Sequence, residues 1–230
     1  SSAGVSLTLT RGRQWLNEGT LNLNGDDRIA FGSVTCCSPE VTALINAAGA
    51  SIQLNTSAAE PLIATGYGAA PQVVNAGTLH KTQAAAQTLA LRSTYQAGDF
   101  SNSGTVDLAA GSLTIRAPGT DTGAWTLAAG TTLDLAYGTR VMSQRANPSG
   151  AGSWGVSGAT VTLDIADASA ALRPLSVSGG SLAVTAAGAL NVAGLTLSGG
   201  TLDLAAGLGG FTLPQDLTVT NATLGLSSSQ

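Results

Sequence analysis

The stretch from Phe100 to Arg116, FSNSGTVDLAAGSLTIR, contains two short alternating runs joined by three small residues. Apolar side chains occupy every second position of TVDL and of SLTI, which is the period of a β-strand with one buried face. The intervening AAG suits a sharp corner, because Gly accepts a positive φ. The stretch therefore predicts two sides of one repeating rung rather than an isolated hairpin.

The same pattern, a hydroxyl residue followed by two apolar residues at alternate positions, recurs along the chain. Its first apolar position returns every 27 to 31 residues in the first part of the chain and every 20 to 22 in the last part. Such periods are typical of solenoids and other repeat proteins. We expect these residues to stack in one inward column, so that Val106, Leu133 and Val161 are neighbours in consecutive rungs. The nine positions are Leu21, Ile52, Leu79, Val106, Leu133, Val161, Leu182, Leu202 and Leu224.

This periodicity predicts an all-β protein: a single right-handed parallel β-helix, or β-solenoid, with about nine rungs of three short strands. We expect residues 1–230 to form one solenoid. Residues 1–155 are predicted to have longer rungs of about 27 residues with loops projecting at 92–100 and 142–154, and residues 156–230 shorter rungs of about 21. Leucine-rich repeats fit less well, because they need an Asn ladder at a fixed offset and usually a helical segment.

Composition excludes several classes of function. Only 10% of the residues are charged and the formal net charge is −4, so no basic patch is available for a phosphate backbone. No apolar run approaches the ~20 residues of a membrane helix. The chain starts and ends within its repeat pattern and shows no signal peptide, so we expect it to be a piece of a longer exported polypeptide.

Two adjacent cysteines, Cys36 and Cys37, lie in a Pro-containing insertion, TCCSPE. Their spacing suits neither a zinc site nor a redox CxxC motif. Three interpretations stay open: two free loop thiols, a vicinal disulfide that stiffens an exposed loop, or a link to another chain.

Two carboxylates carry the strongest chemical hypothesis. Asp107 and Asp134 are predicted to lie in the same outward column on consecutive rungs, ~5 Å apart, where they could bind Ca²⁺ or serve a hydrolase or lyase. The alternative is two solvated charges on a polar face. His80, the only histidine, is expected on the strand surface. The three tryptophans could stack on sugar rings or cover a corner or end of the coil.

The segments VVNAGTLHKT (73–82), FSNSGTVDLAAGSLTI (100–115) and GAWTLAAGTTLDLAYGTRVMS (123–143) resemble β-solenoid repeats of very large exported bacterial surface and adhesin-like proteins. These are similar in style to autotransporter passengers and filamentous haemagglutinins. The resemblance is best over residues 73–161 and carries no catalytic residues. It implies a secreted or cell-surface location. The implied partners are other domains of the same chain and a glycan or cell-surface ligand.

We therefore expect a non-catalytic structural or adhesive segment that acts as a rigid spacer or surface-binding rod. It is expected to need no cofactor and no metal, and neither to bind nucleic acid nor to insert into a membrane. The alternatives are a carbohydrate-binding or polysaccharide-degrading β-helix, and a fibre or tailspike module of the phage type. The sequence motifs GxSxG, HExxH and the P-loop are absent.

Overall fold

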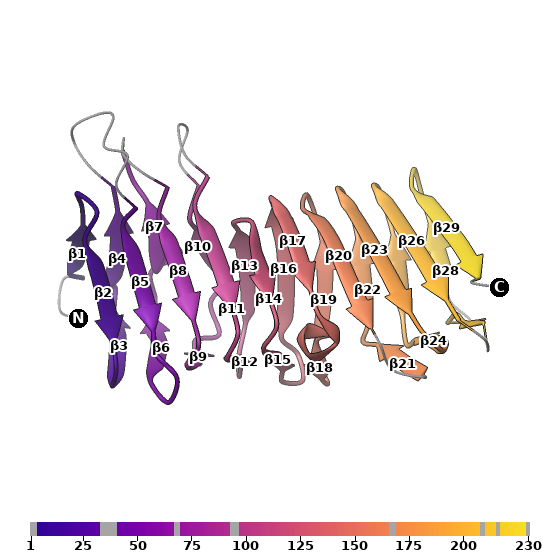
Figure 1. Ribbon diagram of the computed structural model, residues 1–230, viewed down its shortest axis with the longest axis horizontal. Helices are drawn as coiled ribbons and strands as arrows, with labels where there is room; N and C mark the ends of the chain where they lie inside the picture. Colours follow the sequence, from indigo (N-terminus) through magenta and orange to yellow (C-terminus); the bar gives the residue numbers. More distant parts are fainter. Residues whose placement is uncertain are drawn as a thin grey trace.

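The computed structural model is an all-β rod in which the chain coils into a right-handed parallel β-helix, with its two termini at opposite ends (Figure 1). It describes residues 4–32, 41–66, 70–92, 97–165, 169–207, 210–214 and 217–228. Within these ranges the chain forms 29 short strands, and strands three apart in the sequence pair with each other except at one step on the third side of the coil. The predicted fold class is confirmed, with nine to ten rungs.

Two sheets of ten strands run the whole length of the rod. Sheet 1 contains β1 (Ser6–Leu9), β4 (Arg28–Phe31), β7 (Leu62–Ala64), β10 (Gln87–Ala90), β13 (Ser112–Arg116), β16 (Thr132–Tyr137), β19 (Ser153–Val156), β22 (Leu175–Val177), β25 (Leu195–Leu197) and β28 (Leu217–Val219). Sheet 2 contains β2 (Gln14–Asn17), β5 (Ala43–Asn46), β8 (Gln72–Asn75), β11 (Asp99–Asn102), β14 (Gly119–Asp121), β17 (Thr139–Met142), β20 (Thr160–Ile165), β23 (Ser181–Ala186), β26 (Thr201–Ala206) and β29 (Thr223–Ser228).

The third side of the coil is divided between two sheets. Sheet 3 contains β3 (Thr20–Gly25), β6 (Ser51–Thr56), β9 (Thr78–Lys81), β12 (Thr105–Leu108), β15 (Ala124–Leu127) and β18 (Ser149–Gly150). Sheet 4 contains β21 (Ser169–Leu172), β24 (Ala189–Val192) and β27 (Phe211–Thr212). A 3₁₀ turn, η1 (Gln144–Ala146), precedes β18. None of the described segments is a helix long and apolar enough to cross a membrane.

Residues 100–116 fold as predicted, into two sides of one rung. The runs TVDL and SLTI are in β12 and β13, and their four alternating apolar side chains are buried in the core. At the corner between them, Gly111 has φ +68°, and a Cβ there would collide with the backbone of Ala84 in the rung below. Gly is needed at this corner for both reasons.

The predicted inward column is wrong in its central part. Val106 pairs with Leu79 and Trp125 in sheet 3, whereas Leu133 lies in sheet 1 and Val161 in sheet 2. All three side chains are buried, but on different sides of the coil. The reason is that all three sides repeat the same hydroxyl–apolar–x–apolar pattern. Strand periodicity therefore identifies an inward residue without identifying its side.

The rungs also shorten earlier than predicted. Leu79 pairs with Val106, 27 residues later, but Val106 pairs with Trp125, 19 residues later. The change occurs at β12, well before residue 155. Part of the predicted loop at 92–100 lies outside the described residues. The predicted loop at 142–154 is instead folded into the coil as η1, β18 and the start of β19.

A buried ladder of four asparagines runs along the inner side of sheet 2. The Nδ2 atoms of Asn17, Asn46 and Asn75 donate to the Oδ1 atoms of the next asparagine, over 2.8, 2.7 and 2.8 Å; the ladder ends at Asn102. Each Nδ2 also donates to a backbone carbonyl oxygen at the following corner, such as that of Thr105 for Asn75. The ladder thus joins consecutive rungs and anchors their corners, and the strand periodicity did not predict it.

We predict that Asn75→Leu destabilises the protein by about 2–4 kcal/mol, because it leaves buried acceptors on Asn102 and Thr105 without a donor. Leucine has a similar volume, and Leu163 occupies the same column further along sheet 2. Urea denaturation followed by circular dichroism measures the loss. Asn191→Leu, at an exposed position of β24, is the control and should change stability by no more than about 0.5 kcal/mol. Equal effects of the two substitutions would show that the ladder does not stabilise the coil.

Candidate functional site

The outer face of sheet 1 is hollowed over four consecutive rungs. One outward column there contains Asp134, Gly155, Ser176 and Thr196, from β16, β19, β22 and β25. Hydroxyl residues stand on both sides of this column. The resulting groove has a volume of about 520 Å³, and it is the candidate site. We call it the sheet 1 groove.

The groove exists because its residues are small. Gly155 is buried and carries no side chain, and a Cβ there would lie 2.8 Å from the carbonyl oxygen of Ser176. Its neighbours in the column present only short side chains. The floor is therefore largely peptide backbone over the buried Trp154, and the walls carry hydroxyl groups.

Asp134 alone is charged among the described residues that line the groove. The Ser157 hydroxyl donates to its Oδ2 over 2.8 Å. Burial raises the pKa of the Asp134 carboxyl, and hydrogen bonds from Ser157 oppose that rise. The lining of the groove is mostly apolar, with several hydroxyls, one carboxylate and no cation, so the groove suits a neutral or amine-bearing ligand with an apolar face better than a polyanion.

The predicted carboxylate pair does not form. Asp107 lies in sheet 3, between His80 and Thr126, whereas Asp134 lies in sheet 1, between Thr114 and Gly155. The sequence predicts one shared column because both aspartates occupy the same place in the hydroxyl–apolar–x–apolar pattern. The hypothesis of a shared Ca²⁺ or hydrolase site at these two residues is therefore wrong.

His80 instead pairs with Asp107. Its Nδ1 is 2.7 Å from Asp107 Oδ2, and both side chains are partly exposed on the outer face of sheet 3. Exposed pairs of this kind contribute little to stability. Within the described residues, no group of three or more His, Cys, Asp or Glu side chains gathers where it could hold a metal ion. Cys36 and Cys37 lie outside the described residues.

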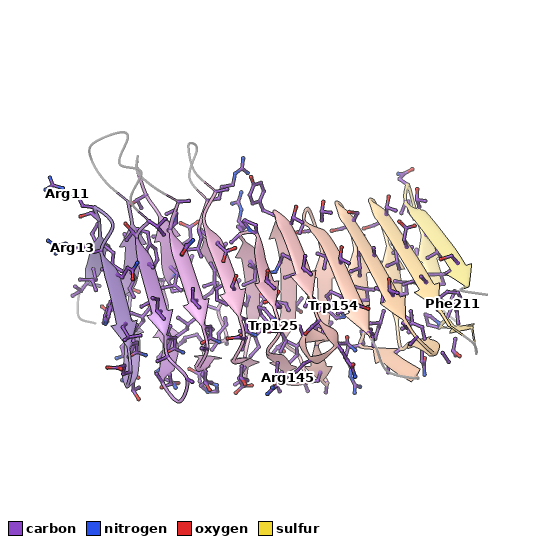
Figure 2. All side chains as sticks on the ribbon, viewed as in Figure 1. Arg11, Arg13, Trp125, Arg145, Trp154 and Phe211 are labelled. Atoms are coloured by element: carbon purple, nitrogen blue, oxygen red, sulfur yellow. The ribbon has the colours of Figure 1, made fainter. Side chains whose placement is uncertain are left out.

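The tryptophans take structural positions. Trp125 and Trp154 are buried inside the coil (Figure 2), and Trp15 packs against the core in the first rung. The Trp125 ring meets Phe100 edge-on, with 6.1 Å between the ring centroids. Only Trp15 lies at an end of the coil, as one of the two interpretations predicts; Trp125 and Trp154 pack in the core within strands β15 and β19, which neither interpretation predicted.

Where the asparagine ladder ends, a buried ion pair takes its place. Asp121 follows Asn102 in the column, and its Oδ2 accepts hydrogen bonds from Arg140 Nε (3.1 Å) and Nη2 (2.6 Å). Arg140 also donates to the carbonyl oxygens of Ala117 and Phe100. Burial raises the pKa of the Asp121 carboxyl, and the Arg140 guanidinium opposes that rise. These groups are fully enclosed, so their role is structural.

Lys81 also points inward, at a position of β9 whose neighbours in the adjacent rungs are Leu54 and Leu108. Its Nζ donates to the carbonyl oxygens of Gln83, Ala85 (2.9 Å) and Ala110 (2.9 Å), so all three ammonium protons have acceptors. Burial lowers the pKa of Lys81. The side chain thus ties together the corners of two consecutive rungs.

The sequence carries a signal for the ladder, which strand periodicity alone does not reveal. Four runs of Asn or Asp, any residue and Gly, namely NEG, NAG, NSG and DTG, begin at Asn17, Asn75, Asn102 and Asp121. The sheet 1 groove had no such signal, because it depends on which residues of different rungs lie side by side.

Comparisons with protein-family models, curated proteins and solved structures find no match to this chain. Of the features that the resemblance implies, the structure shows the architecture, which is a parallel β-solenoid built from repeats.

We predict that Arg140→Met costs about 3–5 kcal/mol, because it leaves the Asp121 carboxylate buried without its partner. The double variant Asp121→Asn/Arg140→Met should lose less than half as much, since the asparagine can extend the ladder from Asn102. Urea denaturation of the wild type, the two single variants and the double variant gives the four free energies of unfolding that form a double-mutant cycle. A strictly additive result would show that the two side chains do not act as a pair.

A second prediction concerns pH. Because the pKa of the Asp134 carboxyl is raised in the folded protein, its protonated form favours folding. This contribution to the free energy of unfolding is fully present below the ordinary pKa of 3.8, and it is lost as the pH rises through the raised pKa. Asp134→Asn should remove this loss and be at least as stable as the wild type at neutral pH. Ser157→Ala should enlarge the loss. Denaturation series from about pH 3 to pH 7 measure it; identical profiles for the three proteins would contradict the prediction.

Proposed function

We propose that this chain is a non-catalytic structural and adhesive segment of an exported bacterial surface protein, in which it acts as a rigid rod. One observation carries the proposal: two ten-stranded sheets run from one end of the rod to the other without interruption. Nine steps of ~4.8 Å give a rod about 43 Å long. Hydrogen bonds between every pair of consecutive rungs resist bending, which suits a spacer.

The outer surface supports the adhesive part of the proposal. It is poor in charge and rich in short hydroxyl and amide side chains, which bind polar partners through many weak hydrogen bonds. The proposed location, secreted or at the cell surface, and the proposed partners, other domains of the same chain and a cell-surface ligand, rest on the resemblance of the repeats.

A second candidate function is carbohydrate binding, which the sheet 1 groove favours. A groove that extends over four rungs and presents hydroxyls beside one carboxylate matches the alternating donors and acceptors of an extended sugar chain. This site would bind a neutral or amine-bearing glycan lengthwise along the rod.

A glycan array tests the two candidates. If the groove binds sugars, Ser176→Tyr should abolish binding by filling it, while Thr162→Tyr, at an exposed outward position of sheet 2, should leave binding unchanged. If the wild type binds no glycan on the array, only the first candidate function, the rigid spacer, remains. Release of reducing or unsaturated ends from polysaccharides, lost in Asp134→Asn, would contradict the non-catalytic proposal.

The location has its own test. An antibody against this chain should label intact cells of the producing bacterium, or its culture fluid, as strongly as permeabilised cells. Labelling only after permeabilisation would contradict the surface location.

A further inference from the structure

Two arginines and a tyrosine from three consecutive rungs meet at the corner where sheet 1 turns toward sheet 2. Arg116 ends β13, and its Cα partner in the next rung is Tyr137, which ends β16. Arg92 follows β10, one rung before Arg116, and its guanidinium carbon Cζ lies 4.2 Å from the centroid of the Tyr137 ring. We call these three residues the arginine corner.

The position of Arg92 is fixed at both its backbone and its guanidinium. The backbone forms an antiparallel bridge with Ala97, and the guanidinium lies over the face of the Tyr137 ring. Cation–π attraction holds a guanidinium in such a place, while the N–H groups around its edge remain able to donate hydrogen bonds. A donor that is held in advance loses less conformational entropy when a ligand binds.

The arginine corner carries positive charge that no carboxylate of the described residues neutralises. The ion pairs within the described ranges are His80–Asp107 and Asp121–Arg140, whereas Arg92 and Arg116 are both exposed and belong to neither. The chain has 13 acidic but only nine basic side chains, so two neighbouring arginines without an acid between them are a local reversal of charge. Guanidinium groups bind the paired oxygens of a carboxylate or a sulfate through two parallel hydrogen bonds.

The arginine corner lies beyond one end of the sheet 1 groove. The groove begins at β16, where Asp134 lines it, and extends through β19, β22 and β25. In the opposite direction along the rod, the next strands of sheet 1 are β13, which ends at Arg116, and β10, which leads into Arg92 (Figure 1). A ligand that follows the groove lengthwise past Asp134 therefore reaches the two arginines.

We propose that the arginine corner binds the negatively charged group of an acidic sugar unit, in a glycan whose neutral units occupy the sheet 1 groove. This inference rests on the carbohydrate-binding candidate above and specifies its ligand class. A uniform polyanion fits poorly, because its charges would also face Asp134 in a groove that has no cation. A glycan with one acidic unit places its charge at the arginines and its uncharged units over the hydroxyls and the apolar lining. Carboxylate and sulfate present the same paired oxygens, so either group fits the site.

Isothermal titration calorimetry with two matched pairs of sugars tests the proposal. Sialyllactose carries one carboxylate, and its carboxyl-reduced form has the same skeleton without the charge. Sulfated lactose and lactose form the second pair. The wild type should bind the acidic member of at least one pair about tenfold more tightly than the neutral member, as one added charge-assisted contact allows. A preference within the first pair alone identifies a carboxylate as the charged group, and a preference within the second pair alone identifies a sulfate.

Single substitutions assign the preference to its residues. Arg92→Gln and Arg116→Gln should each remove most of the preference and leave the affinity for the neutral sugars unchanged. Arg28→Gln, at an exposed position of β4 in the same sheet, is the matched control and should keep the full preference. Equal affinity of the wild type for both members of both pairs would overturn the inference and leave the carbohydrate-binding candidate standing; a preference that survives in both glutamine variants would do the same. If the wild type binds none of the four sugars, the carbohydrate-binding candidate fails and this inference fails with it.

Discussion

Every inward side chain in this rod must fit the side chains directly above and below it, because parallel rungs stack in register at a spacing of ~4.8 Å. The asparagine ladder shows this constraint most clearly. Each amide of Asn17, Asn46 and Asn75 is satisfied only because the next rung presents another amide at the same place. A polar group inside such a coil therefore requires a matching group in its neighbour, or a local substitute. The apolar columns obey the same rule with less specificity, since leucine, valine and isoleucine replace one another freely within them.

The Asp121–Arg140 pair is the substitute at the point where the ladder stops. Asp121 continues the polar column after Asn102, and Arg140 neutralises it, after which the column becomes apolar at Met142 and Leu163. The rungs shorten in the same region, from 27 residues to about 20. The buried pair thus joins two kinds of core: longer rungs with an amide ladder, and shorter rungs closed by aliphatic packing. Such pairs are costly to break, which makes this junction a sensitive point of the fold.

Regular stacking inside leaves the outer face free to vary, and the functional proposals depend on that freedom. The sheet 1 groove arises because the outward position next to Asp134 is a glycine and the following positions are short hydroxyl residues. A rod with a groove along one side suits the proposed binding along its length.

The sequence by itself determined the repeat, the strand period and the parallel coil, because alternation within short strands is set by local backbone geometry. It correctly identified Val106, Leu108, Leu113 and Ile115 as inward residues, and the Gly-containing corner between them. It did not determine which side of the coil a strand occupies, since all three sides use one pattern; hence Asp107 and Asp134 were placed together although they lie on different sheets. The asparagine ladder had a signal in NEG, NAG, NSG and DTG, but its hydrogen bonds depend on register. Only the tertiary structure decided the register, the early shortening of the rungs and the groove, because these depend on contacts between residues about 20 to 30 positions apart that no local pattern specifies.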